Sequence, residues 1–252
     1  MLGGRTIVIT GATSGIGEAC ARLFAQHGAT LVLTGRRQER LEKLAADLSD
    51  ASVHTLALDS RDRDAVGQQF ANLPEPFSAV DVLINNAGLA LSLMSFQDMQ
   101  LDDAEQMIDT NIKGLIYAAH SLLPGMIERS NGHIVNIGSI AGTYPYPGNH
   151  VYGATKSFVK QFTLNLKADL LGTPVKVTNI EPAMTETEFA LVRHHGDEQK
   201  AKDTYSSLEP LMAGDIAESI LWCITRPARV NINSMEVMPV DQASGPLAVN
   251  KK

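Results

Sequence analysis

A tyrosine and a lysine at helical spacing, Tyr152 and Lys156, are the residues of this chain whose chemistry is most informative. Residues four apart share one face of a helix, so the ammonium group is expected to lie near the phenol. A free tyrosine has a pKa near ~10 and is a poor base at neutral pH. A fixed positive charge favours the phenolate and moves its pKa toward the range of a proton-transfer catalyst. The pair therefore predicts acid–base catalysis by Tyr152, assisted by Lys156.

Tyr and Lys at this spacing also occur by chance on helix surfaces, and it is the surrounding sequence that makes the pair specific. A glycine-rich turn follows the first predicted strand, an Asn-Asn-Ala-Gly run at 85–88 closes the fourth, and Ser139 precedes Tyr152 by a short loop. The alternative is a surface tyrosine, a capping serine and an ordinary helical lysine. The combination favours the catalytic interpretation.

Short β-rich runs alternate with amphipathic helical segments along the whole chain. The predicted strands are Thr6–Thr10, Thr30–Thr34, Val53–Leu58, Val80–Asn85, His133–Gly138, Val175–Glu181 and Ser234–Pro239. The predicted helices include Ile16–His27, Glu39–Leu48, Ala104–Arg129 and Tyr152–Leu171. Apolar strands with intervening helices indicate a parallel sheet covered on both faces. We therefore expect an α/β fold: a single dinucleotide-binding domain over residues 1–252, with a doubly wound, Rossmann-type sheet of about seven strands.

The charge, hydropathy and cysteine content of the chain argue against several classes of protein. The net charge of −7 argues against nucleic-acid binding, which needs a basic surface. No apolar run approaches the ~20 residues of a membrane-spanning helix, and the first strand begins too early to leave room for a signal peptide. The two cysteines, Cys20 and Cys223, lie in apolar helical contexts that do not predict a disulfide. We expect a cytoplasmic protein without membrane or nucleic-acid partners.

The turn between the first strand and the first helix has the pattern of a dinucleotide-binding loop. Glycines there permit a tight turn and let the backbone approach a pyrophosphate, whose charge meets the helix N-terminus. A structural turn that binds nothing is the alternative, but the preceding strand and following helix supply the required context. The residues predicted to contact the cofactor are Gly11, Thr13, Ser14, Gly15 and Ile16.

Arg36 and Arg37 follow the second strand, where NAD-binding chains usually carry an acidic residue for the ribose 2′-hydroxyl. A guanidinium group presents a planar set of donors suited to phosphate. The two arginines therefore predict NADP(H) as the cofactor. The alternative is a solvated pair at the start of the next helix.

Two later strand ends contribute further predicted cofactor contacts. Asp59, with Ser60 beside it, follows the third strand and could accept a hydrogen bond from the adenine amino group; a helix N-cap is the competing role. Asn86, Ala87 and Gly88 follow the fourth strand, near the crevice where such sheets bind ligands.

Together with Asn111, these motifs resemble the short-chain dehydrogenase/reductase family, over nearly the whole chain. The resemblance implies that Tyr152 exchanges a proton with the substrate oxygen as hydride moves to or from the nicotinamide. It implies that Lys156 lowers the pKa of Tyr152 and holds the nicotinamide ribose. Ser139 would bind the substrate oxygen, and Asn111 would support a water path from Lys156 to solvent.

Closer similarity is to the NADP-dependent serine/3-hydroxy acid dehydrogenase subgroup, which sulfoacetaldehyde reductases also resemble. The runs at 34–41, 152–156 and 230–239 carry this likeness. Pro182 and Thr187 match the loop after the sixth strand, where they are expected to contact the cofactor. Ala183 replaces the usual glycine of that loop and would be strained if its φ were positive.

The polar segment 185–205 is predicted to be a mobile lid over the nicotinamide that carries substrate specificity. Arg193 within it could bind the anionic end of a substrate, or it could be a surface arginine. Tyr144 and Tyr146 could line the pocket, or they could pack within a proline-rich loop. His194 and His195 face different directions on a helix and lack further ligands, so no metal site is predicted.

The combined prediction is an NADP(H)-dependent oxidoreductase that interconverts a short anionic hydroxy compound, of the 3-hydroxy acid or L-serine type, and its aldehyde. The alternative reaction is the reduction of sulfoacetaldehyde to isethionate. A non-catalytic NADPH-sensing regulator is the alternative from another class, although such a protein has no chemical reason to keep the full catalytic set. The family resemblance implies a homotetramer with Ala104–Arg129 and Tyr152–Leu171 at one interface.

Overall fold

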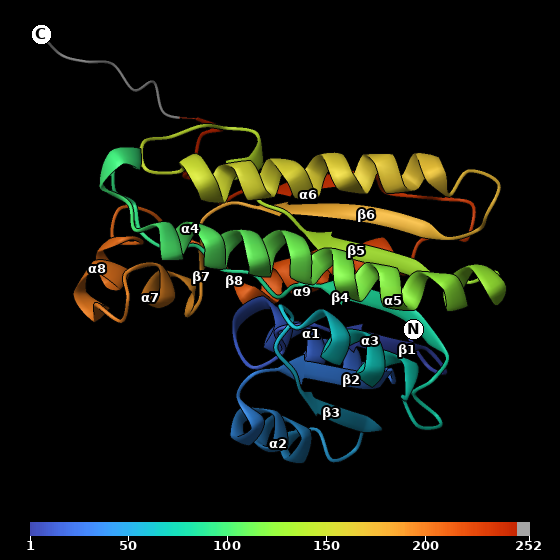
Figure 1. Ribbon diagram of the computed structural model, residues 1–252. Coiled ribbons are helices and arrows are strands. Elements are labelled where there is room, and N and C mark those ends of the chain that lie inside the picture. The colour runs from blue at the N-terminus through green and yellow to red at the C-terminus, as the bar shows by residue number, and fades with distance from the viewer. Residues whose placement is uncertain (246–252) are drawn as a thin grey trace, which may run out of the picture.

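The computed structural model describes residues 1–245 and contains a seven-stranded, fully parallel sheet in the order β3-β2-β1-β4-β5-β6-β9 (Figure 1). The strands are β1 (Thr6–Ile9), β2 (Thr30–Gly35), β3 (Val53–Ala57), β4 (Val80–Asn85), β5 (His133–Ile137), β6 (Lys176–Pro182) and β9 (Ser234–Val237). The strand order reverses between β1 and β4, which opens a crevice at the carboxyl edge of the sheet. The predicted doubly wound, single-domain α/β fold is confirmed.

Alternate residues of the central strands enter two separate apolar layers. Ile7 and Ile9 of β1 belong to one buried cluster, while Val8 belongs to the other. A parallel sheet covered on both faces needs apolar side chains at consecutive positions, and all four residues of β1 are buried. This explains why the strand reads as a continuous apolar run.

Helices cover both faces of the sheet. They are α1 (Gly15–Gln26), α2 (Gln38–Asp47), α3 (Arg63–Ala71), α4 (Leu101–Ile108), α5 (Leu115–Glu128), α6 (His150–Asp169) and α9 (Ala213–Ile224). Residues of α1, α2 and α9 join the first apolar cluster, and residues of α3 and α5 join the second. No helix within residues 1–245 is long and apolar enough to cross a membrane.

The predicted helix Ala104–Arg129 is present as a run of helical residues without a break, and its middle turn is π-helical. A π-helical turn, Asp109–Gly114, separates α4 from α5. Asn111 lies in this turn, and its side-chain amide exchanges two hydrogen bonds of 2.8 Å with the backbone of Leu89. A wider turn of this kind often occurs at functional sites, and here it directs Asn111 toward the end of β4.

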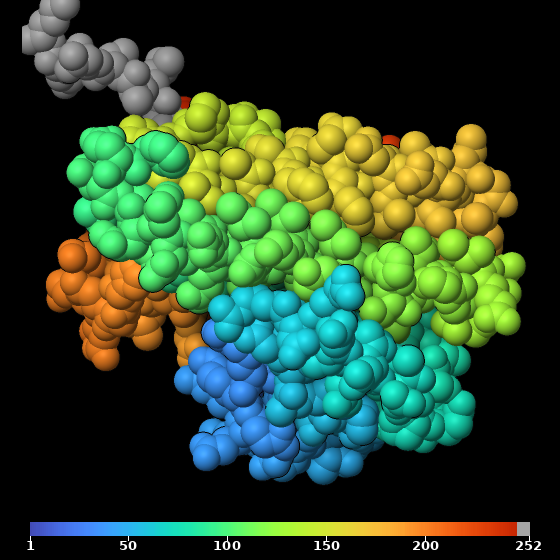
Figure 2. Space-filling view, in the orientation of Figure 1, coloured from blue at the N-terminus to red at the C-terminus, as the bar shows by residue number. Residues whose placement is uncertain are grey.

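The segment after β6 forms a separate small layer at the carboxyl edge of the sheet. It contains β7 (Thr185–Glu186), α7 (Phe189–Arg193) and α8 (Glu198–Asp203), and β7 pairs with β8 (Leu211–Met212). In Figures 1 and 2 this orange layer forms one end of the molecule, next to the green helix α4. It lies where the predicted lid would have to be.

Candidate active site

The four predicted catalytic side chains converge at the carboxyl ends of β4 and β5. Tyr152 and Lys156 project from α6, Ser139 follows β5, and Asn111 comes from the π turn. Tyr152 is 8% exposed and Lys156 is 6% exposed. Both line a cavity of about 670 Å³ together with Ser139. Asn111 lies behind this wall, since a side chain on Gly88 would meet Asn111 Oδ1 at 3.2 Å and Lys156 Nζ at 3.4 Å.

Burial controls the acidity of Tyr152 in the ligand-free protein. Loss of hydration raises the pKa of the phenol to about 12, while Arg193 and the Ser139 hydroxyl act in the opposite direction. The expectation that the adjacent ammonium brings this pKa toward neutrality is therefore not met here. Lys156 Nζ lies 5.8 Å from the centre of the Tyr152 ring, and the cation that lowers the phenol's pKa is Arg193.

Lys156 is itself held by the end of β5. Its ammonium donates a hydrogen bond of 2.7 Å to the carbonyl of Ile137. Burial lowers the pKa of Lys156 to about 8, so the lysine remains largely protonated at neutral pH but can release a proton in a mildly alkaline solution. This group can replenish or accept a proton near the phenol.

The glycine-rich turn has the geometry of a pyrophosphate cradle. Gly11 and Gly15 adopt φ values of +66° and +55°, which favour glycine. A side chain at Gly17 would meet the Gly11 carbonyl oxygen at 2.5 Å. Asn86 donates hydrogen bonds to the carbonyls of Thr10 and Gly11, which fixes the turn to the end of β4. The residues present therefore fit a dinucleotide at the N-terminus of α1.

The two adjacent arginines lie in different surroundings. Arg37 donates to Thr13 Oγ1 at 2.8 Å and Ser14 Oγ at 3.0 Å, and it forms an ion pair with Glu188 at 3.0 Å. Arg36 lines the same cavity and has no hydrogen bond or ion pair to the side chains of residues 1–245. Its guanidinium group is the one available to a phosphate.

A third arginine, Arg40, was not among the predicted site residues. It forms two contacts, of 2.6 and 2.9 Å, with the carboxylate of Glu188. Glu188 precedes α7, so Arg37 and Arg40 connect the dinucleotide end of the cavity to the predicted lid. The sequence carries no local signal for this link, because the partners are about 150 positions apart along the chain.

The other predicted cofactor residues also lie along the cavity. Asp59 forms an ion pair of 2.6 Å with Arg61, and the N-cap of α3 is Asp62, so the alternative capping role of Asp59 is wrong. Ser60 lies against Gly114, and Thr187 lies against Gly15. The cavity lining includes Ser60, Ala87, Gly88, Pro182 and Thr187.

Ala183 is not strained. Its φ lies outside the positive region, and its amide donates to the carbonyl of Val237 at 2.9 Å, which extends the pairing of β6 with β9. Alanine therefore fits the loop where the family pattern has glycine.

Arg193 reaches over the ring of Tyr152. Its guanidinium carbon lies 5.3 Å from the centre of the Tyr152 ring and 5.0 Å from that of Phe189. Nη2 donates to the hydroxyl of Tyr146 at 3.4 Å, whereas the buried Nε has no partner within the described part of the chain. A positive group with spare donors thus faces the cavity beside the phenol, as expected of an anion-binding residue.

The cavity walls combine predicted and unpredicted residues. Tyr144 and Tyr146 line it, and Tyr144 also donates to Glu236 at 3.4 Å. Residues 242–245 line it as well, and the Gln242 side chain accepts a hydrogen bond of 3.1 Å from the amide of Met184. No motif marks this C-terminal segment, since only the folded chain brings it back to the site.

The adjacent histidines contact different partners. His195 contacts Asp103 at 3.2 Å, and His194 contacts Thr204. Within residues 1–245, no group of three potential metal-ligating side chains is found.

Comparison with known proteins identifies the family. The model of the short chain dehydrogenase family matches residues 5–197. The chain belongs to this family. It is 53% identical to sulfoacetaldehyde reductase 2 of Chromohalobacter salexigens, over 97% of this chain and 98% of that protein. It is 49% identical to the NADP-dependent 3-hydroxy acid dehydrogenase YdfG of Escherichia coli, over 98% of this chain and 99% of that protein.

Solved structures agree with this assignment. The closed form of serine dehydrogenase complexed with NADP+ is 48% identical, covers 98% of this chain and 100% of its own, and superposes with a TM-score of 0.94. Serine dehydrogenase from Escherichia coli is 44% identical, with a TM-score of 0.82, over 94% of this chain and 99% of its own. This short-chain dehydrogenase is therefore an oxidoreductase, and the alternative of a non-catalytic regulator loses its support.

Proposed function

We propose that this short-chain dehydrogenase interconverts a short anionic hydroxy compound and its aldehyde with NADP(H). The observation that carries the proposal is the placement of Arg193, whose guanidinium group lies 5.3 Å from the centre of the Tyr152 ring inside the cavity. A carboxylate or sulfonate bound to Arg193 would place the next one or two carbons of the substrate near the phenol. The names of the relatives specify serine, 3-hydroxy acids and sulfoacetaldehyde as their substrates, which supports this substrate class.

The proposed reduction needs one proton and one hydride. When bound, the cofactor supplies the hydride to the carbonyl carbon. Tyr152 gives its phenolic proton to the carbonyl oxygen, and Ser139 stabilises the charge that develops on that oxygen. Lys156 returns a proton to Tyr152, and Asn111 supports a water path that connects Lys156 with solvent. Oxidation of the alcohol reverses each step.

The preference for NADP(H) rests on Arg36. Because Arg37 is engaged by Thr13, Ser14 and Glu188, we assign Arg36 as the main contact of the 2′-phosphate and Arg37 as a supporting one. The remaining proposed cofactor contacts are Gly11, Thr13, Ser14, Gly15, Ile16, Asp59, Ser60, Asn86, Ala87, Gly88, Tyr152, Lys156, Pro182 and Thr187.

Replacing Arg36 with alanine tests this assignment. Loss of charged hydrogen bonds to phosphate should weaken NADPH binding about 10- to 100-fold and leave NADH binding unchanged. Arg63→Ala is the matched control, because Arg63 is an exposed arginine of α3 that pairs with its exposed neighbour Asp64. Equal loss of NADPH and NADH affinity in Arg36→Ala would contradict the assignment.

Segment 185–205 is proposed to act as the substrate lid, with Arg193, Tyr144 and Tyr146 as substrate contacts. In support, α7 places Phe189 against Tyr152, with ring centres 5.6 Å apart. Glu188, at the start of α7, is anchored to Arg37 and Arg40. The lid thus contacts both the catalytic tyrosine and the dinucleotide end of the cavity.

Steady-state assays test the proposed function directly. NADPH and NADH oxidation would be measured with malonic semialdehyde and sulfoacetaldehyde, and NADP+ reduction with L-serine and 3-hydroxypropionate. We expect rapid NADPH-linked turnover of one anion, which also separates the carboxylate from the sulfonate alternative. Tyr152→Phe should lower kcat about 10²- to 10⁴-fold with NADPH still bound, and Arg193→Met should mainly raise the KM of the anion. Tight NADPH binding without turnover of any of these compounds would contradict the proposal.

We also propose a cytoplasmic homotetramer in which α4–α5 and α6 form one interface. In support, Phe158 and Phe162 stack on α6 with ring centres 5.8 Å apart, and Leu164 of the same helix is 41% exposed. Exposed apolar groups on one helix are typical of a subunit contact. Light scattering should give four times the mass of the 27.1 kDa chain, and Leu164→Glu should lower that mass.

A further inference from the structure

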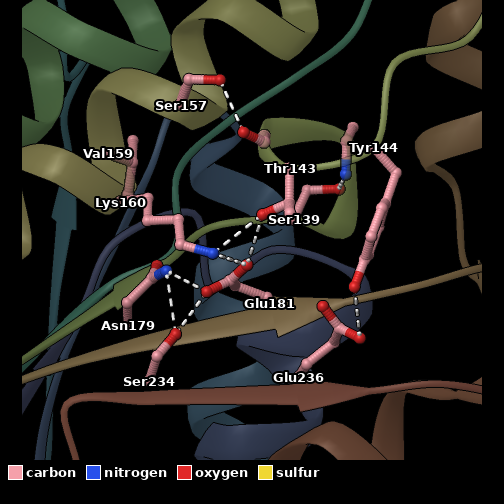
Figure 3. Close-up of polar contacts among 12 residues, drawn as sticks. Ser139, Thr143, Tyr144, Ser157, Val159, Lys160, Asn179, Glu181, Ser234 and Glu236 are labelled. Atoms are coloured by element: carbon pink, nitrogen blue, oxygen red, sulfur yellow. Dashed lines mark hydrogen bonds and ion pairs between the residues drawn. The ribbon is translucent and has the colours of Figure 1, made fainter. Parts of the chain in front are cut away.

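A buried carboxylate, Glu181, lies behind the catalytic serine and is fully supplied with hydrogen-bond donors (Figure 3). It is 2% exposed and sits near the end of β6. Oε1 accepts hydrogen bonds from Asn179 at 2.9 Å and from the hydroxyl of Ser234. Oε2 accepts from Thr143 at 3.2 Å and from the ammonium of Lys160 at 3.1 Å. Four elements of the fold therefore meet at one side chain.

Lys160 supplies the charge that this carboxylate needs. Its side chain is 36% exposed, whereas that of Glu181 is 2% exposed, so the negative group bears nearly all the desolvation. A buried ion pair is weak evidence for stability, because well-packed apolar residues often serve stability as well or better. Its presence directly behind the active site points to a role in geometry.

The network holds the turn that carries the catalytic serine. Ser139 begins this turn, with its Oγ accepting from the amide of Ala141 at 3.1 Å, and Thr143 ends it. Lys160 donates to Thr143 at 2.8 Å, which fixes the far end of the turn. The middle is also fixed, because Ser157 of α6 donates to the carbonyl of Gly142 at 2.7 Å.

The opposite side of Ser139 is connected to the same carboxylate through the backbone. Pro182 follows Glu181, and its carbonyl accepts a hydrogen bond of 3.4 Å from Ser139 Oγ. Lys160 lies one helical turn beyond Lys156 on α6. The same helix therefore carries the proposed catalytic lysine, Lys156, and the lysine that bonds to the serine turn, Lys160. Shifts of the serine turn relative to Tyr152 are therefore resisted from β6 and from α6.

We infer that Glu181 and Lys160 are a positioning pair, which sets the place of the Ser139 hydroxyl relative to Tyr152 for the proposed reaction. This inference rests on the proposed function, because it assumes that Ser139 binds the reacting oxygen. Neither Glu181 nor Lys160 is among the described residues that line the cavity. Its loss should lower kcat while NADPH affinity stays the same, since misplacement of a catalytic group by about 1 Å can reduce the rate about 10²-fold.

Three variants test the pair. Glu181→Gln keeps the shape of the side chain and removes its charge, and we expect kcat to fall about tenfold or more with NADPH affinity unchanged. Thr143→Val leaves the Glu181–Lys160 ion pair in place and removes the hydrogen bonds of both residues to the turn. Because Thr143 is exposed, this variant should fold even if Glu181→Gln does not. Lys160→Arg preserves the charge and should retain most of the activity. Lys167→Met, which removes a positive charge from the same helix, is the matched control.

A double-mutant cycle with Ser139→Ala separates positioning from a merely structural role. If the pair acts through the serine hydroxyl, Glu181→Gln and Thr143→Val should have little further effect on kcat once that hydroxyl is gone. An undiminished effect in the Ser139→Ala background, or wild-type kcat in both single variants, would overturn the inference. Absence of turnover by the unmodified protein would instead overturn the proposed function, so the two failures are distinguishable.

Discussion

Replacing Lys156 with methionine should stabilise the folded protein at neutral pH while it disables catalysis. Burial lowers the pKa of this lysine from 10.5 to about 8. Since one pKa unit corresponds to about 1.4 kcal/mol, carrying the charge costs the folded state about 3 kcal/mol at pH 7. Methionine has a similar length and needs no hydration. The lost hydrogen bond to Ile137 offsets about 1–2 kcal/mol of the gain, which leaves a net stabilisation of about 1–2 kcal/mol.

The pH dependence of the stability difference between Lys156→Met and the unmodified protein gives a sharper test. Between pH 8 and 10.5 the unfolded lysine binds a proton that the folded lysine has released, so the stability of the unmodified protein rises with pH in this window. The advantage of Lys156→Met should therefore be constant below pH 8 and disappear as the pH approaches 10.5. Urea unfolding at fixed protein concentration, without cofactor, measures both proteins. Lys167→Met, on the same helix, is the control.

Two results would refute this reasoning about Lys156. One is a Lys156→Met variant that is less stable than the unmodified protein at pH 7. The other is an advantage of equal size at pH 7 and pH 10.5, which would show that packing, rather than the buried charge, produces it.

Four further predictions concern other sites. Burial lowers the pKa of His133 to about 3, so the unfolded state binds the extra proton and stability should fall as the pH decreases from about 6.5 toward 3. His133→Gln should flatten this fall in urea unfolding, with the exposed His120→Gln as the control. Glu188→Gln removes two exposed ion pairs of the lid and should raise the substrate KM about 2- to 4-fold in low salt but not in 1 M salt. Gly17→Ala should abolish NADPH binding measured by fluorescence, because its methyl group would meet the Gly11 carbonyl at 2.5 Å. Gly67→Ala, in open space on α3, should slightly stabilise the protein.

Local patterns were sufficient for the fold and for the centre of the site. The alternation of apolar strands and amphipathic helices predicts the parallel sheet, because each element must bury its own apolar surface. The glycine-rich turn is predictable for a similar reason, since its backbone conformation depends on residues adjacent in sequence. Tyr152 and Lys156 share a helix face by spacing alone. Ser139 follows from the rule that strand ends at the carboxyl edge of such a sheet lie together.

Features that depend on contacts between distant segments required the tertiary structure. The helix expected over residues 104–129 contains a π-helical turn, from which Asn111 bonds to the backbone after β4. Arg40 forms an ion pair with Glu188, and residues 242–245 line the cavity. None of these contacts can be predicted from the spacing of apolar and polar residues along the sequence, because each depends on how whole elements pack together.

The acidity of Tyr152 and Lys156 shows most clearly what the sequence determined and what the tertiary structure determined. The sequence by itself determined that a phenol and an ammonium group share one helix face, because 3.6 residues per turn fixes that geometry. Only the tertiary structure decided their pKa values, because burial in the folded chain raises the pKa of Tyr152 and lowers that of Lys156. It also decided that Arg193, from a segment 41 positions away in the chain, lies over the phenol ring. Solvent exclusion and long-range contacts are properties of the packed chain.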